Sequence, residues 1–168
     1  TPAQAAAIQA SLDQAPGQLN FLSDLFGPYP FDSSGAVADR AAGVGYALEV
    51  QGKPHYAGGF DTGNPSISLG TQLHEIAHQW FGNSATLRTW ADIWFNEGWA
   101  NWSQWYWSAQ TQDGDDPAVR FDEAYANTPA ERWEIAPAVL DGDPANLFAF
   151  FPTYQRGAMT LQVYREIV

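Results

Sequence analysis

The chain has 168 residues, 45% of them hydrophobic, which suits one domain or slightly more with a buried core. Its formal net charge is −12 and Lys53 is its single lysine, which argues against nucleic acid or an anionic membrane as partner, because both attract basic surfaces. The chain has no cysteine, which excludes disulfide bonds, and its longest uncharged apolar run is far too short to span a membrane.

The N-terminal part of the chain predicts two helices followed by a small sheet. Residues 3–13 are alanine-rich and indicate a helix, and a Pro-Gly pair within residues 15–17 punctuates the chain after it. Residues 18–26 carry apolar side chains at helical spacing. Residues 35–51 and 56–60 contain short β-like runs broken by glycine, which we interpret as strands of a small sheet.

A histidine pair lies in the next predicted element. Residues 64–70 are predicted to form a loop that leads into a helix with the pattern His-Glu-x-x-His, made by His74, Glu75 and His78. Histidines four positions apart lie about one helical turn apart, so both imidazoles can bind one metal ion. Glu75 is placed to act as a general base on water, and Gly82 is the predicted helix terminator. Taken alone, the pattern also arises by chance on amphipathic helices.

A third metal ligand follows in a second helical segment, which opens at Asp92. Glu97 comes after His78 with eighteen residues between them, enough for the chain to turn back against the first helix. Two histidines and one carboxylate form a catalytic zinc set that keeps its fourth position for water, whereas structural zinc sites are normally closed by cysteines. The sequence therefore predicts one catalytic Zn²⁺ held by His74, His78 and Glu97.

The helix predicted over residues 96–109 carries an aromatic stripe, which we interpret as core. The stripe comprises Trp99, Trp102 and Tyr106. Metal-bound histidines also need acceptors for their second ring nitrogen. Asp92 and Asn101 are candidates by position, and each could equally be a cap or a surface residue.

The C-terminal part is predicted to be helical with two interruptions. The aspartate-rich residues 111–116 are interpreted as a solvated turn, because they are too few for a calcium loop. Residues 119–133 and 153–168 are predicted to be helical, and residues 137–152 irregular.

The segment from His74 to Asn83, the spacer, and the segment from Trp94 to Gly98 together resemble the core of the aminopeptidase N family of gluzincin metallopeptidases. Residues 26–31 resemble the family segment that leads into the active-site sheet, so the resemblance extends from about Leu19 to the C-terminus. It implies an α+β, thermolysin-like zinc metallopeptidase catalytic domain with a small N-terminal sheet and a mostly helical C-terminal part. The implied activity is hydrolysis of the N-terminal peptide bond by metal-activated water.

The resemblance also implies roles for residues outside the zinc motif. Residues 152–158 resemble the family's Tyr-x-Lys-Gly segment with arginine in place of lysine, and Tyr154 is then the phenol that stabilises the oxyanion. Residues 46–50 are the counterpart of the family's Gly-Ala-Met-Glu-Asn strand, although the glycine and asparagine are replaced. Glu49 then grips the α-ammonium group of a peptide with a free N-terminus, and Ala47 lines the same substrate strand.

Two other functions stay open on the sequence. The same zinc set could hydrolyse a non-peptide electrophile, as in the family's epoxide hydrolase branch, or the domain could bind peptides without turnover. Thr1 is no natural start and the last helix reads as cut short. We therefore expect residues 1–168 to be one metallopeptidase catalytic domain, excised from a longer protein with flanking domains on both sides.

Overall fold

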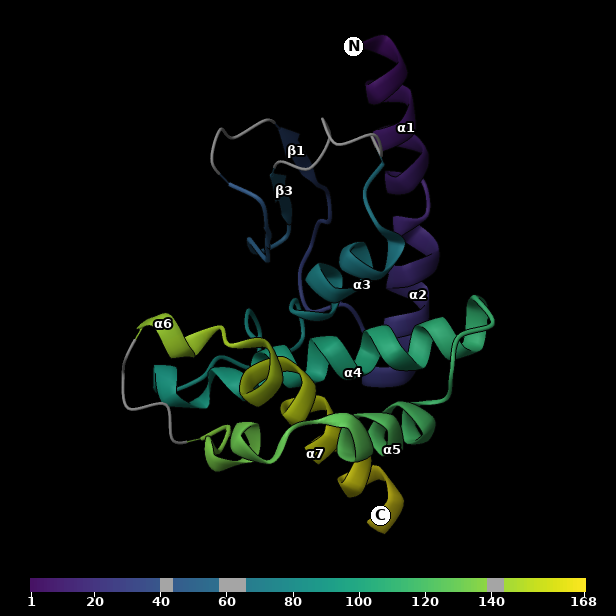
Figure 1. The fold of residues 1–168 in the computed structure, drawn as a ribbon. Helices are drawn as coiled ribbons and strands as arrows, with labels where there is room; N and C mark the ends of the chain where they lie inside the picture. Colours follow the sequence, from purple (N-terminus) through teal and green to yellow (C-terminus); the bar gives the residue numbers. More distant parts are fainter. Residues whose placement is uncertain (40–43, 58–65, 139–143) are drawn as a thin grey trace. The chain divides into compact units, whose positions relative to one another are not determined.

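A computed structural model describes residues 1–39, 44–57, 66–138 and 144–168 of the chain (Figure 1). The chain divides into two compact units, Thr1–Ser84 and Ala85–Val168. Both contain helices, and the small sheet belongs to the first unit. No helix in the described ranges is long and apolar enough to cross a membrane.

The first unit begins with two helices, α1 (Pro2–Leu12) and α2 (Ala15–Phe26). Thr1 caps α1, since its hydroxyl accepts a hydrogen bond from the Gln4 backbone N–H at 3.3 Å. The prediction that residues 15–17 separate the helices is wrong, because α2 already starts at Ala15. Its proline lies in the first turn, where the missing N–H has no intrahelical partner to lose.

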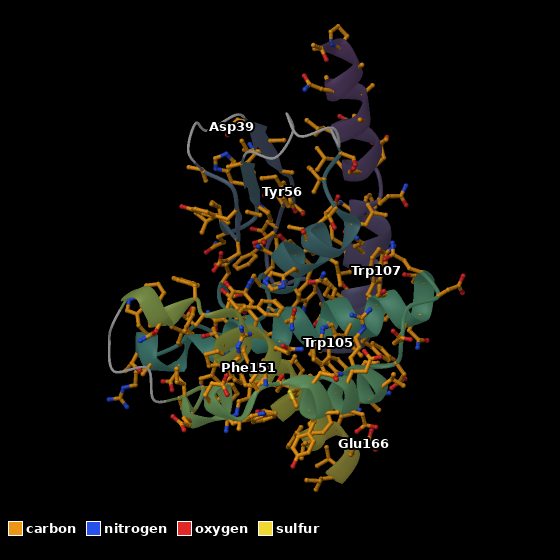
Figure 2. The ribbon with its side chains drawn as sticks, in the orientation of Figure 1. Asp39, Tyr56, Trp105, Trp107, Phe151 and Glu166 are labelled. Atoms are coloured by element: carbon orange, nitrogen blue, oxygen red, sulfur yellow. The ribbon has the colours of Figure 1, made fainter. Side chains whose placement is uncertain are left out.

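The predicted small sheet is confirmed and has three short strands. These are β1 (Val37–Asp39), β2 (Ala47–Leu48) and β3 (His55–Ala57), in the order β1-β3-β2. Strand β1 pairs with β3 in parallel and β2 pairs with β3 antiparallel, so that β2 lies at an edge. Figure 2 labels Tyr56, a buried core residue of β3. Parts of the predicted strand regions, residues 40–43 and 58–60, lie outside the described residues.

Helix α3 (Leu69–Ala77) carries His74, and His78 is the residue that caps its C-terminal end. Ser68 caps its N-terminus, so the loop predicted over residues 64–70 is wrong at its last two positions; residues 64 and 65 lie outside the described part. The helix ends at Ala77, earlier than the predicted terminator Gly82. Hydrogen-bonded turns of different lengths follow, and Gly82 has φ 131°, a conformation that favours glycine.

Contacts between α2, α3 and the segments that follow them hold the first unit together. Leu22 and Leu73 are completely buried, which stabilises the unit by about 1.5–3 kcal/mol for each side chain. Gln18 donates from Nε2 to the carbonyl of Leu69 at 2.8 Å. Trp80 donates from Nε1 to the carbonyl of Gly27 at 3.0 Å, which ties the end of α2 to the turns after α3.

The second unit is built around the long helix α4 (Ile93–Thr111), which packs against α5, η3 and α7 (Figure 1). The other elements are η1 (Trp90–Asp92), α5 (Pro117–Asn127), η2 (Ala130–Glu134), α6 (Pro144–Leu147), η3 (Phe150–Gln155) and α7 (Arg156–Ile167). Residues 150–155 form a π-helical segment that leads directly into α7. Phe151, labelled in Figure 2, is buried and packs edge-on against Trp133, with ring centroids 5.0 Å apart.

Several predictions for the second unit need correction. The helix predicted over 119–133 is interrupted, because α5 ends at Asn127 and Pro129 precedes the separate η2. The region 137–152 is not wholly irregular, since α6 and the start of η3 lie in it; residues 139–143 lie outside the described part. The turn before α5 is confirmed, and its Asp116 caps α5 by accepting from the Ala118 N–H at 2.9 Å.

The aromatic stripe of α4 is confirmed as core at its centre. Trp102 is buried, stacks on Tyr106 with ring centroids 5.2 Å apart, and donates from Nε1 to Gln162 Oε1 at 2.9 Å. Trp99 is half-buried at one end of the stripe. The stripe therefore joins α4 to α7.

Two glycines allow α4 and α7 to approach closely. A Cβ atom added to Gly98 would lie 2.8 Å from the carbonyl carbon of Gly157. A Cβ atom added to Gly157 would lie 2.8 Å from the Trp94 carbonyl oxygen. Any larger side chain at either position would force the helices apart. Gly98 directly follows Glu97 in the chain, and Gly157 comes three residues after Tyr154.

Candidate metal centre and active site

Both histidines of the predicted zinc motif lie at the C-terminal end of α3. Their ring centroids are 4.8 Å apart with an interplanar angle of 77°. His78 is 1% exposed and forms the C-cap residue, whereas His74 lies one turn earlier and is half-buried. The helix therefore presents two imidazoles close enough to share one metal ion, as the sequence spacing predicts.

A backbone hydrogen bond orients the His78 imidazole. Its Nδ1 lies 3.0 Å from the carbonyl oxygen of Phe81. A carbonyl only accepts hydrogen bonds, so Nδ1 carries the proton and Nε2 keeps its lone pair for a metal. This arrangement fits a zinc ligand, because metal-bound histidines donate their second ring N–H to such acceptors.

The acceptor of His78 differs from the candidates suggested by sequence position. Asn101 Nδ2 donates to the Tyr154 carbonyl at 3.3 Å, and Asp92 Oδ2 accepts from Thr89 Oγ1 at 3.0 Å. The Asp92 side chain therefore bonds across η1 to Thr89, and Asn101 holds the segment that carries Tyr154. The acceptor is instead the backbone carbonyl of Phe81, in the turns after α3. A sequence pattern does not reveal a main-chain acceptor, because every residue has a carbonyl group.

The first unit also brings Glu49 close to α3. Ligating atoms of Glu49, Glu75 and His78 all lie within 4.8 Å of one another. Glu49 directly follows β2, in which Ala47 pairs with Tyr56 of β3. The cluster thus combines two carboxylates with an imidazole, a donor set that could hold a metal ion.

Tyr56 adjoins this cluster and was not singled out by the sequence. Burial raises the pKa of its phenol, and the negative charge of Glu75 raises it further. Tyr56 therefore stays protonated near neutral pH, and its hydroxyl donates to the Gln72 carbonyl at 3.5 Å. A tyrosine within a short β-like run carries no local sign that it will face a buried glutamate.

The second unit holds Glu97 and Tyr154. Glu97 lies in the first turns of α4, and its side chain is buried, with 4% of its surface exposed. The half-buried Tyr154 lies in η3, and its ring stacks on Phe150 with centroids 6.0 Å apart. Because Glu97 belongs to the second unit, the ligand set of His74, His78 and Glu97 remains a prediction.

Arg156 occupies the position of the lysine in the Tyr-x-Lys-Gly segment that residues 152–158 resemble. Its side chain holds the end of η2 in place. Its Nη1 donates to the carbonyl oxygens of Trp133 and Ile135 at 3.0 and 2.8 Å. Its guanidinium carbon also lies 5.2 Å from the centroid of the Trp133 ring. Lysine lacks the planar fork that combines these contacts.

Comparison with known proteins gives consistent matches. The family model described as the peptidase family M1 domain matches residues 69–163. Over 72% of the present chain, the sequence is 35% identical to aminopeptidase M1-C of Oryza sativa subsp. japonica. It is 30% identical to endoplasmic reticulum aminopeptidase 1 of Rattus norvegicus over 93% of its length. The chain spans only 16% and 18% of these two relatives.

Solved structures of an M1 zinc metallopeptidase from Deinococcus radiodurans are also similar. One is 30% identical with a TM-score of 0.70, covering 90% of this chain and 32% of that one. A mutant of the same enzyme bound to a Tyr-Ser-Ala substrate is 31% identical with a TM-score of 0.68. That match covers 89% of this chain and 31% of the other.

Proposed function

This chain belongs to peptidase family M1, and from that premise we propose that it is a zinc-dependent aminopeptidase that hydrolyses the N-terminal peptide bond of peptides. The observation that carries the proposal is the cluster of Glu49, Glu75 and His78 within 4.8 Å. It combines a candidate metal ligand, a candidate base and a carboxylate for a substrate ammonium group. The proposal includes a thermolysin-like fold and treats residues 1–168 as one catalytic domain.

The proposed zinc ligands are His74 and His78 through ring nitrogens and Glu97 through its carboxylate. Zn²⁺ bound by three such ligands supplies a Lewis acid that polarises a carbonyl and lowers the pKa of water to about 7. Two observations support the set: the Nδ1 contact of His78 with the Phe81 carbonyl and the burial of Glu97.

The remaining proposed roles belong to side chains of this chain. Glu75 accepts a proton on its carboxylate as water attacks the scissile carbonyl, and then passes that proton to the leaving amine. Tyr154 donates a hydrogen bond from its hydroxyl to the carbonyl oxygen as negative charge develops there. Glu49 binds the substrate α-ammonium group, and Ala47 lines the same strand. Together these roles place only the first peptide bond at the reacting position.

The metal assignment predicts that His78→Ala loses zinc. One nitrogen ligand disappears and the buried site keeps an incomplete donor set, so affinity falls steeply. Elemental analysis of protein purified without chelator is expected to find about one equivalent of zinc in the wild type and a small fraction of that in the variant. His55→Ala is the matched control, because it removes an imidazole outside the proposed ligand set. His55 lies on β3, and its Nε2 is 3.0 Å from Asp39 Oδ1. Unchanged zinc in His78→Ala would contradict the ligand set.

The exopeptidase assignment predicts that N-acetylation of a peptide blocks its cleavage. Acetylation removes the positive charge that Glu49 is proposed to bind, and loss of such a charged contact lowers kcat/KM by at least about tenfold. Hydrolysis of one peptide in free and acetylated forms by the protein of full natural length measures this. Equal turnover of both forms would indicate an endopeptidase. Binding of the free peptide without any turnover would indicate a peptide-binding module.

A further inference from the structure

We infer that Gln79 and Asn83 are positioning residues that brace the turn carrying Glu49 against α3, the helix of His74 and Glu75. The inference rests on the proposed function, in which Glu49 binds the substrate ammonium group. Both residues lie in the turns that follow α3, and all of the contacts involved belong to the first unit. The brace decides whether the Glu49 carboxylate stays beside Glu75.

Gln79 links the Glu49 turn to the general base through one side-chain amide. The side chain is 1% exposed. Its Nε2 donates to the carbonyl of Glu75 at 3.2 Å, and its Oε1 accepts from the backbone N–H of Gly52 at 2.8 Å. The donor and acceptor are both in use, so the amide has one orientation.

Asn83 makes the second link. Its Nδ2 donates to the carbonyl oxygen of Glu49 at 2.6 Å. The backbone N–H of Asn83 donates to the carbonyl of His78 at 3.0 Å, which anchors Asn83 to the C-terminal end of α3. Glu49 is therefore tied through one residue to a proposed zinc ligand.

Gln79 and Asn83 bind two backbone groups of the Glu49 turn that make no bond within the turn. Within the turn, Val50 N–H donates to the Leu48 carbonyl and Lys53 N–H to the Val50 carbonyl, both at 2.9 Å. The Gly52 carbonyl accepts from the Gly35 N–H at 2.9 Å. The Glu49 carbonyl and the Gly52 N–H are satisfied by Asn83 and Gln79 instead, so backbone pairing alone does not hold the turn to α3.

The geometry of the cluster explains why such a brace matters. Ligating atoms of Glu49, Glu75 and His78 lie within 4.8 Å of one another, so the position of the Glu49 turn sets where its carboxylate lies beside Glu75. The apolar neighbours Tyr46 and Val50 are 65% and 46% exposed, so they do little to anchor the strand. A shift of about 1 Å in a binding group is enough to lose much of its effect.

The test compares two buried glutamines that both contact α3. Gln79→Met keeps the volume and removes both hydrogen bonds. Gln18→Met is the matched control, because Gln18 is 2% exposed and donates to the Leu69 carbonyl at the other end of α3. For the best aminoacyl 4-nitroanilide, we expect Gln79→Met to raise KM by about tenfold. Its kcat is expected to change by less than about threefold, and its zinc content to stay at the wild-type value. Gln18→Met is expected to keep the wild-type KM.

A double-mutant cycle with Glu49→Gln separates positioning from general destabilisation. If Gln79 acts through Glu49, Gln79→Met adds no further rise in KM once Glu49 is replaced. Asn83→Ala is expected to behave in the same way, and it provides the test if Gln79→Met does not fold. Two outcomes would overturn the brace if Glu49→Gln itself has a raised KM. One is a rise in KM for Gln79→Met and Asn83→Ala that adds to the effect of Glu49→Gln, and the other is a wild-type KM in both of these variants. A wild-type KM in Glu49→Gln itself would overturn the proposed role of Glu49, and the brace with it.

Discussion

Glu75→Gln is expected to lower kcat by at least about 10²-fold, with zinc content unchanged. Glu75 is buried on α3, and glutamine has the same size and shape as glutamate. The variant is therefore expected to keep the fold. An amide cannot accept the proton that water gives up when it attacks the scissile carbonyl. Steady-state hydrolysis of an aminoacyl anilide, together with elemental analysis of the same sample, measures both quantities.

Glu123→Gln is the matched control for this experiment. It makes the same chemical change on the exposed surface of α5, within the second unit, and is expected to leave kcat at the wild-type value. A Glu75→Gln enzyme with near wild-type kcat would show that another group takes the proton. Loss of zinc in Glu75→Gln would instead assign Glu75 to metal binding.

Tyr154→Phe is expected to lower kcat on the order of 10²–10³-fold, since it removes one donor to the developing oxyanion. Phenylalanine retains the stacking of this ring on Phe150 and does not disturb the backbone contact with Asn101, which uses the Tyr154 carbonyl. The π-helical segment is therefore expected to keep its position. KM and zinc content are expected to change little, because the hydroxyl acts mainly in the transition state.

Tyr125→Phe is the matched control for the phenol, because Tyr125 lies on α5 and is 66% exposed. Its kcat is expected to equal that of the wild type. An equally active Tyr154→Phe enzyme would remove Tyr154 from the proposed mechanism. A rise in KM without a fall in kcat would assign the hydroxyl to substrate binding instead.

Residues close together in the chain made the arrangement of the histidine pair predictable. The spacing of His74 and His78 follows from helical geometry, and the structure places both rings at one end of α3. The sheet, the aromatic core of α4 and the turn before α5 were also predictable, because short-range patterns of apolar, glycine and aspartate residues encode them. Element ends were less predictable: α2 starts three residues before residue 18, and α3 ends before Gly82.

The sequence by itself determined the histidine pair, the candidate base and the family, because these depend on residue types at fixed spacing. Only the tertiary structure decided what holds the segments that carry Glu49 and Tyr154. The bonds from Gln79 to Gly52, from Asn83 to Glu49 and from Asn101 to Tyr154 join residues 27, 34 and 53 positions apart. The close approach of Gly98 and Gly157 is also a contact between distant segments. Such contacts depend on how the chain packs, and no local pattern specifies which distant backbone group a buried amide will meet.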